Sequence, residues 1–201
     1  TDPVVFSFNN YIVSGAIDRV EYRSSFDLAA IATLGFGLEH ERTSSSTSYE
    51  GGPAQLQDTQ VTGGYAQLSL RPVEGLTLTG GVRHDDYSTY GGHTTLDGNL
   101  AWSLNGGATV LRATFAEGFR APTLTEGQPP YGNPALKPET ARNIDLGIEQ
   151  ALLDDQVRFG LTWFNRRSTD LIVYSFSSGQ SENVGQVDTD GAEFALLVKP
   201  T

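Results

Sequence analysis

The sequence predicts an all-β protein, namely a segment of an antiparallel transmembrane β-barrel with long loops at one end and short turns at the other. Three observations support this fold class. Apolar and polar residues alternate with a period of two along most of the chain, which is typical of strands with one apolar face. The alternating segments run for about 10–12 residues, whereas strands of soluble proteins average about 5–6. The connections alternate between short and long, as they do in membrane barrels.

Nine strands are expected, in the order in which the alternation appears along the chain. They lie at about 16–26, 31–42, 59–71, 76–87, 94–104, 108–118, 140–151, 156–167 and 187–199. Short turns are expected at 72–75, 105–107 and 153–155, long loops at 43–58, 119–139 and 168–186, and an intermediate loop at 88–93. Segment 4–13 fits either a strand or a loop. The first long loop, 43–58, is expected to be flexible, because it contains the Ser-rich run 44–48 and the Gly-Gly-Pro run 51–53.

Five successive strands each have one face without charge. On strands 76–85, 94–104, 108–117, 143–149 and 157–166, the apolar positions include Leu78, Leu100, Phe115, Leu146 and Leu161, and Phe194 continues the pattern on the last strand. The other face carries charges of both signs near mid-strand: Arg19, Glu21, Arg23, Arg83, Arg112, Asp145, Arg158 and Glu193. Aromatic residues fall near strand ends, as in the interfacial girdles of membrane barrels: Tyr22, Tyr65, Tyr87, Trp102 and Trp163.

Two architectures could use such a face. A soluble antiparallel sandwich buries its apolar face against a second sheet, whereas a membrane barrel turns that face to lipid and its polar face to a lumen. Segment length, mid-strand charges and aromatic positions favour the barrel. The alternation by itself leaves the sandwich open.

Composition limits the classes of function. The 201 residues suffice for one domain, and the chain contains no Cys, so neither a disulfide framework nor a Cys-based metal site is possible. The net charge of −11 argues against nucleic acid as a partner, because no basic patch could neutralise phosphates. The acidic excess suits a surface that collects cations, and equally an ordinary solubilising surface. The absence of Met, even at position 1, indicates a processed chain or a piece of a longer one.

Two phrases in the region 118–140 carry a resemblance to a known family. The first is Gly118-Phe119-Arg120-Ala121-Pro122-Thr123-Leu124, at the end of an expected strand, and the second is Gly132-Asn133-Pro134-Ala135-Leu136-Lys137-Pro138-Glu139-Thr140. Strand, long loop and strand together resemble the C-terminal barrel region of the TonB-dependent outer-membrane receptors. In that family a strand ends in a GFRAP(T)L phrase, and an extracellular loop carries GNP.LKPE into the next strand. Similar family phrases occur at 65–72, 76–85, 164–172 and 183–194.

The resemblance implies a receptor that binds a scarce nutrient, usually a ferric siderophore or cobalamin, and imports it when TonB pulls on a plug domain. It implies the outer membrane of a Gram-negative bacterium, with membrane lipid, the receptor's own plug, TonB and a small metal chelate as partners. No plug, TonB box or closing aromatic-ended strand is found in 1–201, so we expect a partial barrel domain, about nine strands of roughly 22. Substrate, oligomeric state and bound calcium stay open.

The resemblance places candidate site residues in the loops. Arg120, Tyr131 and Tyr174 are the candidate ligand contacts, because aromatic and Arg side chains give large contact areas and directed hydrogen bonds. The loop motif comprises Gly118, Phe119, Arg120, Pro122, Asn133, Pro134, Lys137, Pro138 and Glu139. The structural alternative is that the two prolines only fix a turn and that Arg120 only anchors its loop to neighbouring carboxylates.

No cofactor and no enzymatic activity are expected. The chain lacks a Cys nucleophile and a GxSxG motif, and its few His residues have no consistent Ser or Asp partner. His84, Asp85, Asp86 and His93 match no common metal signature, and Asp85-Asp86 and Asp188/Asp190 are weak calcium candidates. The alternative functions are a passive porin-like barrel and a soluble sandwich used in adhesion, and detergent dependence separates a barrel from a sandwich.

Overall fold

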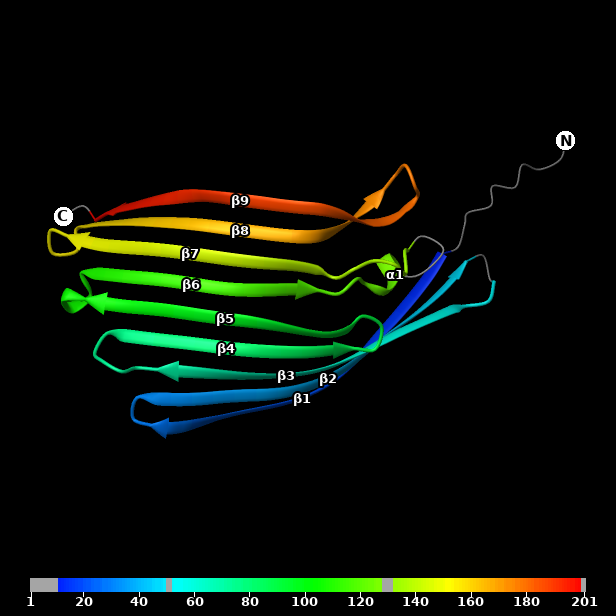
Figure 1. Cartoon of the computed structure of the whole chain (residues 1–201), viewed down its shortest axis with the longest axis horizontal. Helices are drawn as coiled ribbons and strands as arrows, with labels where there is room; N and C mark the ends of the chain where they lie inside the picture. Colours follow the sequence, from blue (N-terminus) through cyan, green and yellow to red (C-terminus); the bar gives the residue numbers. More distant parts are fainter. Residues whose placement is uncertain (1–10, 50–51, 128–131, 200–201) are drawn as a thin grey trace.

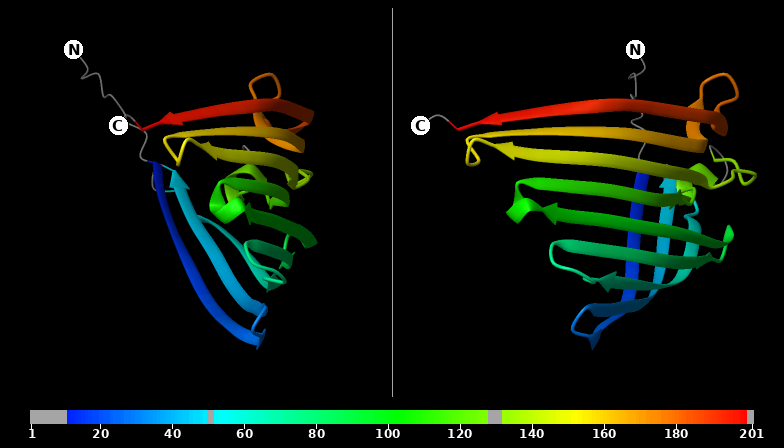
Figure 2. Two further views of the ribbon diagram at one scale, coloured as in Figure 1. Left: turned by 90° about the vertical axis from the view of Figure 1, so that its left-hand side faces the viewer. Right: turned by 60° about the vertical axis from the view of Figure 1, so that its left-hand side comes forward.

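The described part of the chain forms a single antiparallel sheet of nine strands. The computed structural model describes residues 11–49, 52–127 and 132–199. Within these ranges the strands follow one another in chain order, each paired with the next, and β1 and β9 form the two edges (Figure 1). Seen from its end, the sheet is a strongly curved, open wall (Figure 2). The predicted all-β class and the antiparallel order are confirmed.

Eight of the nine strands are longer than the sequence predicted, and β4 has the predicted bounds. Their bounds are β1 Tyr11–Ala29, β2 Ala32–Tyr49, β3 Gln55–Leu70, β4 Leu76–Tyr87, β5 Gly91–Leu104, β6 Thr109–Arg120, β7 Glu139–Leu152, β8 Val157–Ser175 and β9 Gln180–Val198. A short 3₁₀ turn, η1 Asn105–Gly107, joins β5 to β6, and a one-turn helix, α1 Leu124–Gly127, lies between β6 and β7. No helix in the described ranges is long and apolar enough to cross a membrane.

Two of the three expected long loops are mostly strand. Within the expected loop 43–58, β2 continues to Tyr49 and β3 begins at Gln55, and within 168–186, β8 reaches Ser175 and β9 begins at Gln180. The Ser-rich run 44–48 is typical of a loop by its composition. In the structure its residues pair with strands on both sides, so that Ser44 lies opposite Ala16 on β1 and opposite Asp58 on β3. Pairing with two neighbours overrides weak local strand propensity. Residues 11–13 of the undecided segment 4–13 belong to β1, and 4–10 lie outside the described residues.

The register collects the apolar side chains on one face. One row of directly paired residues runs from Leu78 through Leu100, Ala113, Leu146 and Trp163 to Ala192. Directly opposite residues of an antiparallel pair share a face, so this row and its alternate neighbours define the apolar face. Among its members are Leu38, Leu68, Leu78, Val82, Leu96, Leu100, Leu111, Phe115, Ile144, Leu146, Ile148, Leu161, Phe194 and Leu196. The face predicted from alternation is confirmed.

No second layer of described residues covers the apolar face. Leu146 is 50% exposed and Phe194 is 68% exposed, and among the described hydrophobic side chains only Leu136 counts as buried, at 5%. A soluble sandwich would bury these residues against a second sheet. On β4 the apolar positions run from Leu76 to Val82, about 20 Å of strand at ~3.3 Å per residue, which approaches the ~25 Å apolar band of membrane barrels.

Glycines make room on the opposite, polar face. A Cβ on Gly63 would overlap the Asp85 carboxylate, and one on Gly81 would overlap the Asp97 carboxylate. Glycine in these strands therefore allows the close approach of a side chain from the neighbouring strand. In the same way the Tyr65 ring covers Gly37.

Two of the five expected interfacial aromatics were assigned wrongly. Tyr65 pairs with Arg83, and Tyr87 pairs with Val61, so both belong to the polar face and cannot contribute to a lipid-facing girdle. Tyr22 and Trp102 lie on the apolar face, as expected. Trp163 is also on the apolar face, but it pairs directly with Leu146 in the middle of the apolar band and not near a strand end.

Candidate functional site

The connections at one end of the sheet form the candidate site. Hairpins alternate between the two ends: 30–31, 71–75, 105–108 and 153–156 lie at one end, while 50–54, 88–90, 121–138 and 176–179 lie at the other. The predicted topology is thereby confirmed, since every connection expected to be short falls at the first end and every one expected to be long at the second. Residues 50–51 and 128–131 of the second set lie outside the described residues.

Arg120 anchors the longest of these connections. Its Nε donates to Glu139 Oε2 at 2.9 Å and its Nη2 to Glu139 Oε1 at 2.6 Å, while Nη1 donates to Glu126 Oε2 at 2.8 Å. Arg120 closes β6, Glu139 opens β7, and Glu126 belongs to α1 between them. The guanidinium therefore holds both ends of the loop and its helical turn together, as a planar fork can with two carboxylates.

A capping box shapes the helical turn. Thr123 Oγ1 accepts a hydrogen bond from the Glu126 backbone N–H at 3.2 Å, and Glu126 Oε2 accepts one from the Thr123 backbone N–H at 2.8 Å. This reciprocal pair is the arrangement of a T-x-x-E sequence at a helix start. It leaves Glu126 in place to receive Arg120.

Asn183 ties the same loop to the β8–β9 hairpin. Its side-chain Oδ1 accepts from the Lys137 backbone N–H at 2.8 Å, and its Nδ2 donates to the carbonyls of Lys137 at 2.8 Å and Asp170 at 2.7 Å. Glu139 Oε1 also accepts from the Ile172 backbone N–H at 2.7 Å. The two outer segments, 121–138 and the β8–β9 hairpin, therefore form one connected unit.

The loop carboxylates are held ionised. Partial burial alone would raise the pKa of Glu126, but the hydrogen bonds from Arg120 and Thr123 outweigh it and lower that pKa. The hydrogen bond from Arg120 lowers the pKa of Glu139 against the effect of partial burial, and the Ile172 N–H adds to this. The same two carboxylates raise the pKa of Arg120.

The aromatic candidates differ in what can be said of them. Tyr174 is 48% exposed near the tip of the β8–β9 hairpin, with the Phe176 ring edge-on at 5.3 Å and itself 94% exposed. Tyr131 lies outside the described residues.

The loop motif contains a defined turn. The Asn133 side chain accepts a hydrogen bond from the Ala135 N–H at 2.9 Å, which is the Asx turn expected of the Asn-Pro sequence. Pro122, in the same connection, is buried.

The polar face below the site carries a chain of ion pairs. Arg19 donates to Glu41 at 2.7 Å and lies 3.4 Å from Glu39, which in turn lies 3.5 Å from Arg83. Arg83 also binds Asp85 at 2.6 Å. Further along the sheet Arg112 pairs with Glu149, and Arg158 pairs with Asp155 at 2.8 Å. The mid-strand charges expected on this face are present there and mostly paired.

The four residues weighed as a metal site do not converge. His84 and Asp86 are on the apolar face of β4, whereas Asp85 and His93 are directly paired on the polar face. Asp85 is engaged by Arg83, and the His93 ring stacks on Phe119 at 3.9 Å. No cluster of three potential ligands exists among the described residues.

Sequence reasoning missed the two residues that join the loops. Glu126 could have been found from the T-x-x-E pattern at 123–126, which is a capping-box signal. Asn183 begins one of the family phrases, but nothing in the sequence indicated that it joins the loops, because its partner Lys137 is 46 residues away and meets it only through the strand register.

Comparison with known families gives the decisive observation. The sequence model of the family described as TonB dependent receptor-like, beta-barrel matches residues 3–198, nearly the whole chain.

The chain belongs to this family of TonB-dependent receptors.

Solved structures of similar fold agree with this assignment. The siderophore receptor PirA from Acinetobacter baumannii matches with a TM-score of 0.76 at 19% identity, over 94% of this chain and 35% of that one. PirA from Pseudomonas aeruginosa matches with a TM-score of 0.76 at 24% identity, over 90% and 37%. The ferric enterobactin receptor PfeA from Pseudomonas aeruginosa, in complex with enterobactin, matches with a TM-score of 0.73 at 22% identity, over 92% and 33%.

The matches show the fold and its extent. The chain spans about a third of the length of the solved chains it resembles. Members of this receptor family lie in the outer membrane of Gram-negative bacteria and are transport receptors, not enzymes. The apolar face is the lipid-facing wall of such a barrel. The end that carries 121–138 has the longest connection, and long connections are extracellular in such barrels.

Proposed function

We propose that this chain forms part of the barrel wall and extracellular rim of an outer-membrane receptor that binds and imports a ferric siderophore. The observation that carries the proposal is the connected rim. Arg120, Glu139 and Asn183 fasten the 121–138 loop to the β8–β9 hairpin on top of a lipid-facing wall. Binding residues concentrate on loops that a rigid scaffold positions. Two of the similar structures are named siderophore receptors and a third a ferric enterobactin receptor, which supports a siderophore over cobalamin.

Within the proposed function, the rim residues have different roles. Tyr174 and Tyr131 contact the ligand. Arg120 acts chiefly by holding the loop, because its guanidinium is already bonded to the carboxylates of Glu126 and Glu139. In the complete receptor, the polar face lines a lumen that a plug domain fills, and TonB acts on that plug. The domain 1–201 is then a piece of a larger barrel.

The test uses the full-length receptor in a Gram-negative host that lacks its own siderophore receptors. Uptake of iron-55 loaded onto defined siderophores is measured with and without TonB. A siderophore receptor takes up at least one chelate only when TonB is present. Uptake that continues without TonB indicates the passive porin-like alternative, and TonB-dependent uptake of cobalamin alone would overturn the substrate assignment.

Residue roles are tested in the same host. Tyr174→Ala should weaken siderophore binding about tenfold, as expected for an aromatic hot spot, and Tyr131→Ala should act in the same direction. Val73→Ala is the matched control, because Val73 is 56% exposed in the turn at the opposite end of the sheet. If Tyr174→Ala binds like Val73→Ala, the β8–β9 hairpin does not contact the ligand.

A further inference from the structure

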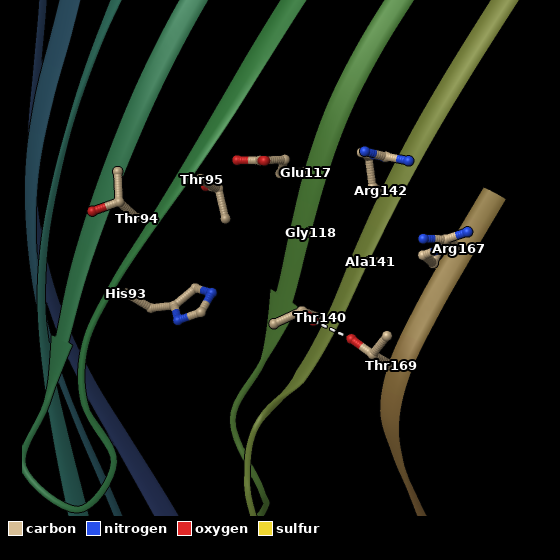
Figure 3. Close-up of a pocket in the computed structure, with 10 residues that line it drawn as sticks. All are labelled: His93, Thr94, Thr95, Glu117, Gly118, Thr140, Ala141, Arg142, Arg167 and Thr169. Atoms are coloured by element: carbon tan, nitrogen blue, oxygen red, sulfur yellow. Dashed lines mark hydrogen bonds between the residues drawn. The ribbon is translucent and has the colours of Figure 1, made fainter. Parts of the chain in front are cut away.

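A groove opens in the wall where β5 and β6 stop pairing. The β5–β6 ladder ends at Asp97 and Ala116, although β5 continues to pair with β4 as far as Gly91 and β6 with β7 as far as Arg120. In the gap, the Leu96 backbone N–H donates to the Glu117 carboxylate at 3.0 Å. A cavity of about 290 Å³ lies beside this gap and reaches across β7 to β8 (Figure 3).

The groove lies directly above the apolar face. Its central row of paired residues runs from Glu117 through Arg142 and Arg167 to Asp188. The next row towards the membrane contains Phe115 and Ile144, both members of the apolar face. The first row above it contains Thr140 and Thr169, whose hydroxyls are 2.5 Å apart. The row of charges therefore marks the extracellular border of the lipid-facing band.

Two guanidinium groups share this border with two carboxylates, but only Asp188 bonds to one of them, because Glu117 accepts from the Leu96 N–H instead. Arg142 and Arg167 are direct cross-strand partners on one face, an arrangement in which like charges repel. Arg167 donates its Nε to Asp188 at 2.6 Å. Arg142 forms no ion pair with any residue that the structure describes. In Figure 3 the two arginines lie side by side on β7 and β8, while the Glu117 carboxylate turns towards β5 and its bond to Leu96.

An anion between the arginines would resolve this repulsion. A phosphate offers several acceptor oxygens to the unused N–H groups of both guanidiniums, whose planar fork suits phosphate geometry. Thr140 and Thr169 line the same cavity, and whichever hydroxyl accepts in the bond between them keeps its own proton free to donate to a phosphate. A phosphate bound in this row would have apolar surface immediately below it, at Phe115, Ile144 and Leu146, of which Leu146 is 50% exposed.

We propose that this groove binds the phosphate of a lipid headgroup in the outer leaflet of the membrane. The arginines and threonines hold the phosphate, and the acyl chains lie along the apolar face below. A lipid fits better than free phosphate because the site faces outwards at the edge of the hydrocarbon band, where headgroup phosphates lie. The row of charges lies on the opposite face of the wall from the lumen, while His93 and Thr95 line the cavity from the polar face at the gap beside β5. The row is separate from the loop cluster around Arg120, which lies on the polar face.

The test measures lipid retention by the purified, delipidated full-length receptor. Native mass spectrometry and thermal melting are recorded after addition of phosphatidic acid, diacylglycerol with the same acyl chains, or inorganic phosphate. The wild type should retain phosphatidic acid in preference to diacylglycerol and melt at a higher temperature with it. Arg142→Gln combined with Arg167→Gln should weaken that retention about tenfold or more, because charge-assisted phosphate contacts are lost.

Arg166→Gln is the matched control. Arg166 neighbours Arg167 in sequence but lies on the polar face, where it donates to Asn143 at 3.1 Å, so its loss should leave lipid retention unchanged. Should the double variant fail to fold, Arg142→Gln alone decides, since it removes no ion pair with the described residues.

Three outcomes would overturn the proposal. Equal retention of diacylglycerol would show that only the acyl chains adhere. Equal stabilisation and full competition by inorganic phosphate would show a soluble-anion site instead of a lipid site. Unchanged retention by the arginine variants would place the lipid elsewhere on the wall.

Discussion

The membrane band and the extracellular rim of this sheet are held together in different ways. In the band, uninterrupted ladders join neighbouring strands, the apolar face has no protein cover among the described residues, and its leucines and phenylalanines need lipid as their solvent. At the rim, a few polar side chains hold the structure: Arg120 bridges Glu126 and Glu139, and Asn183 bridges two segments. The band depends on its environment, whereas the rim depends on specific partners.

This difference has a physical consequence for where each region tolerates change. In the band, almost any apolar residue serves on the lipid side, because the main chain satisfies its own hydrogen bonds. At the rim, Arg120 and Asn183 fix the 121–138 segment, which no strand ladder holds between β6 and β7, so a single substitution releases that loop. A rim that is locally fastened can be rearranged for a new ligand without disturbing the wall.

The largest expected contrast is in accessibility. Because the 201 residues contain no Cys, a single introduced Cys reports on its own position. In intact cells a bulky, membrane-impermeant thiol reagent should label Ser178→Cys, which lies in the 176–179 hairpin, and should not label Glu74→Cys, which lies in the 71–75 turn. Both residues are exposed, so labelling of Glu74→Cys from outside would reverse the assignment of the two ends.

The next contrast is between the two faces of the band. Leu146→Arg places a charge at mid-band on the lipid side and should cost about 2–4 kcal/mol of unfolding free energy, measured by refolding the receptor into bilayers. Asp145→Asn, one residue away on the polar face, should cost much less. Equal losses would mean that the two faces are wrongly assigned.

A smaller and more local effect is expected at the rim. Arg120→Ala leaves the carboxylates of Glu126 and Glu139 without their shared partner, which should cost about 1–3 kcal/mol, confined to the loop. Hydrogen exchange should therefore rise in 121–138 and at the start of β7 while the band strands keep their protection. Exchange that rises equally throughout the sheet would contradict the separation of rim from band.

The smallest effect is a pH dependence of the rim. The folded pKa values of Glu126 and Glu139 are lowered, so their contribution to stability is complete above the unfolded value near 4.5 and is lost as the pH falls through the folded values. Proteolysis of 121–138 should accelerate below about pH 4.5 in the wild type. In Arg120→Ala the acceleration should be much weaker, and an unchanged acid response in that variant would assign it to other groups.

Much of the band was predictable from the sequence, and less of the rim. Alternation is a local property, so Leu78, Leu100 and Leu146 could be placed on one face without knowledge of their partners. The loop anchor at Arg120 was foreseen as an alternative role, with carboxylates nearby. The extent of the β2–β3 and β8–β9 hairpins was not foreseen, because hydroxyl-rich strand ends resemble loops until they are paired.

The sequence by itself determined the all-β class, the number of strands, the apolar face and the end that carries the long connection 121–138. Each of these follows from the period of two and from turn residues, which act over a few neighbouring positions. Only the tertiary structure decided which side chains meet across strands. The bond between Asn183 and Lys137, the placement of Arg142 beside Arg167, and the gap between β5 and β6 all depend on register. Register is set by the whole row of strands together, and a shift of one residue would exchange the two faces.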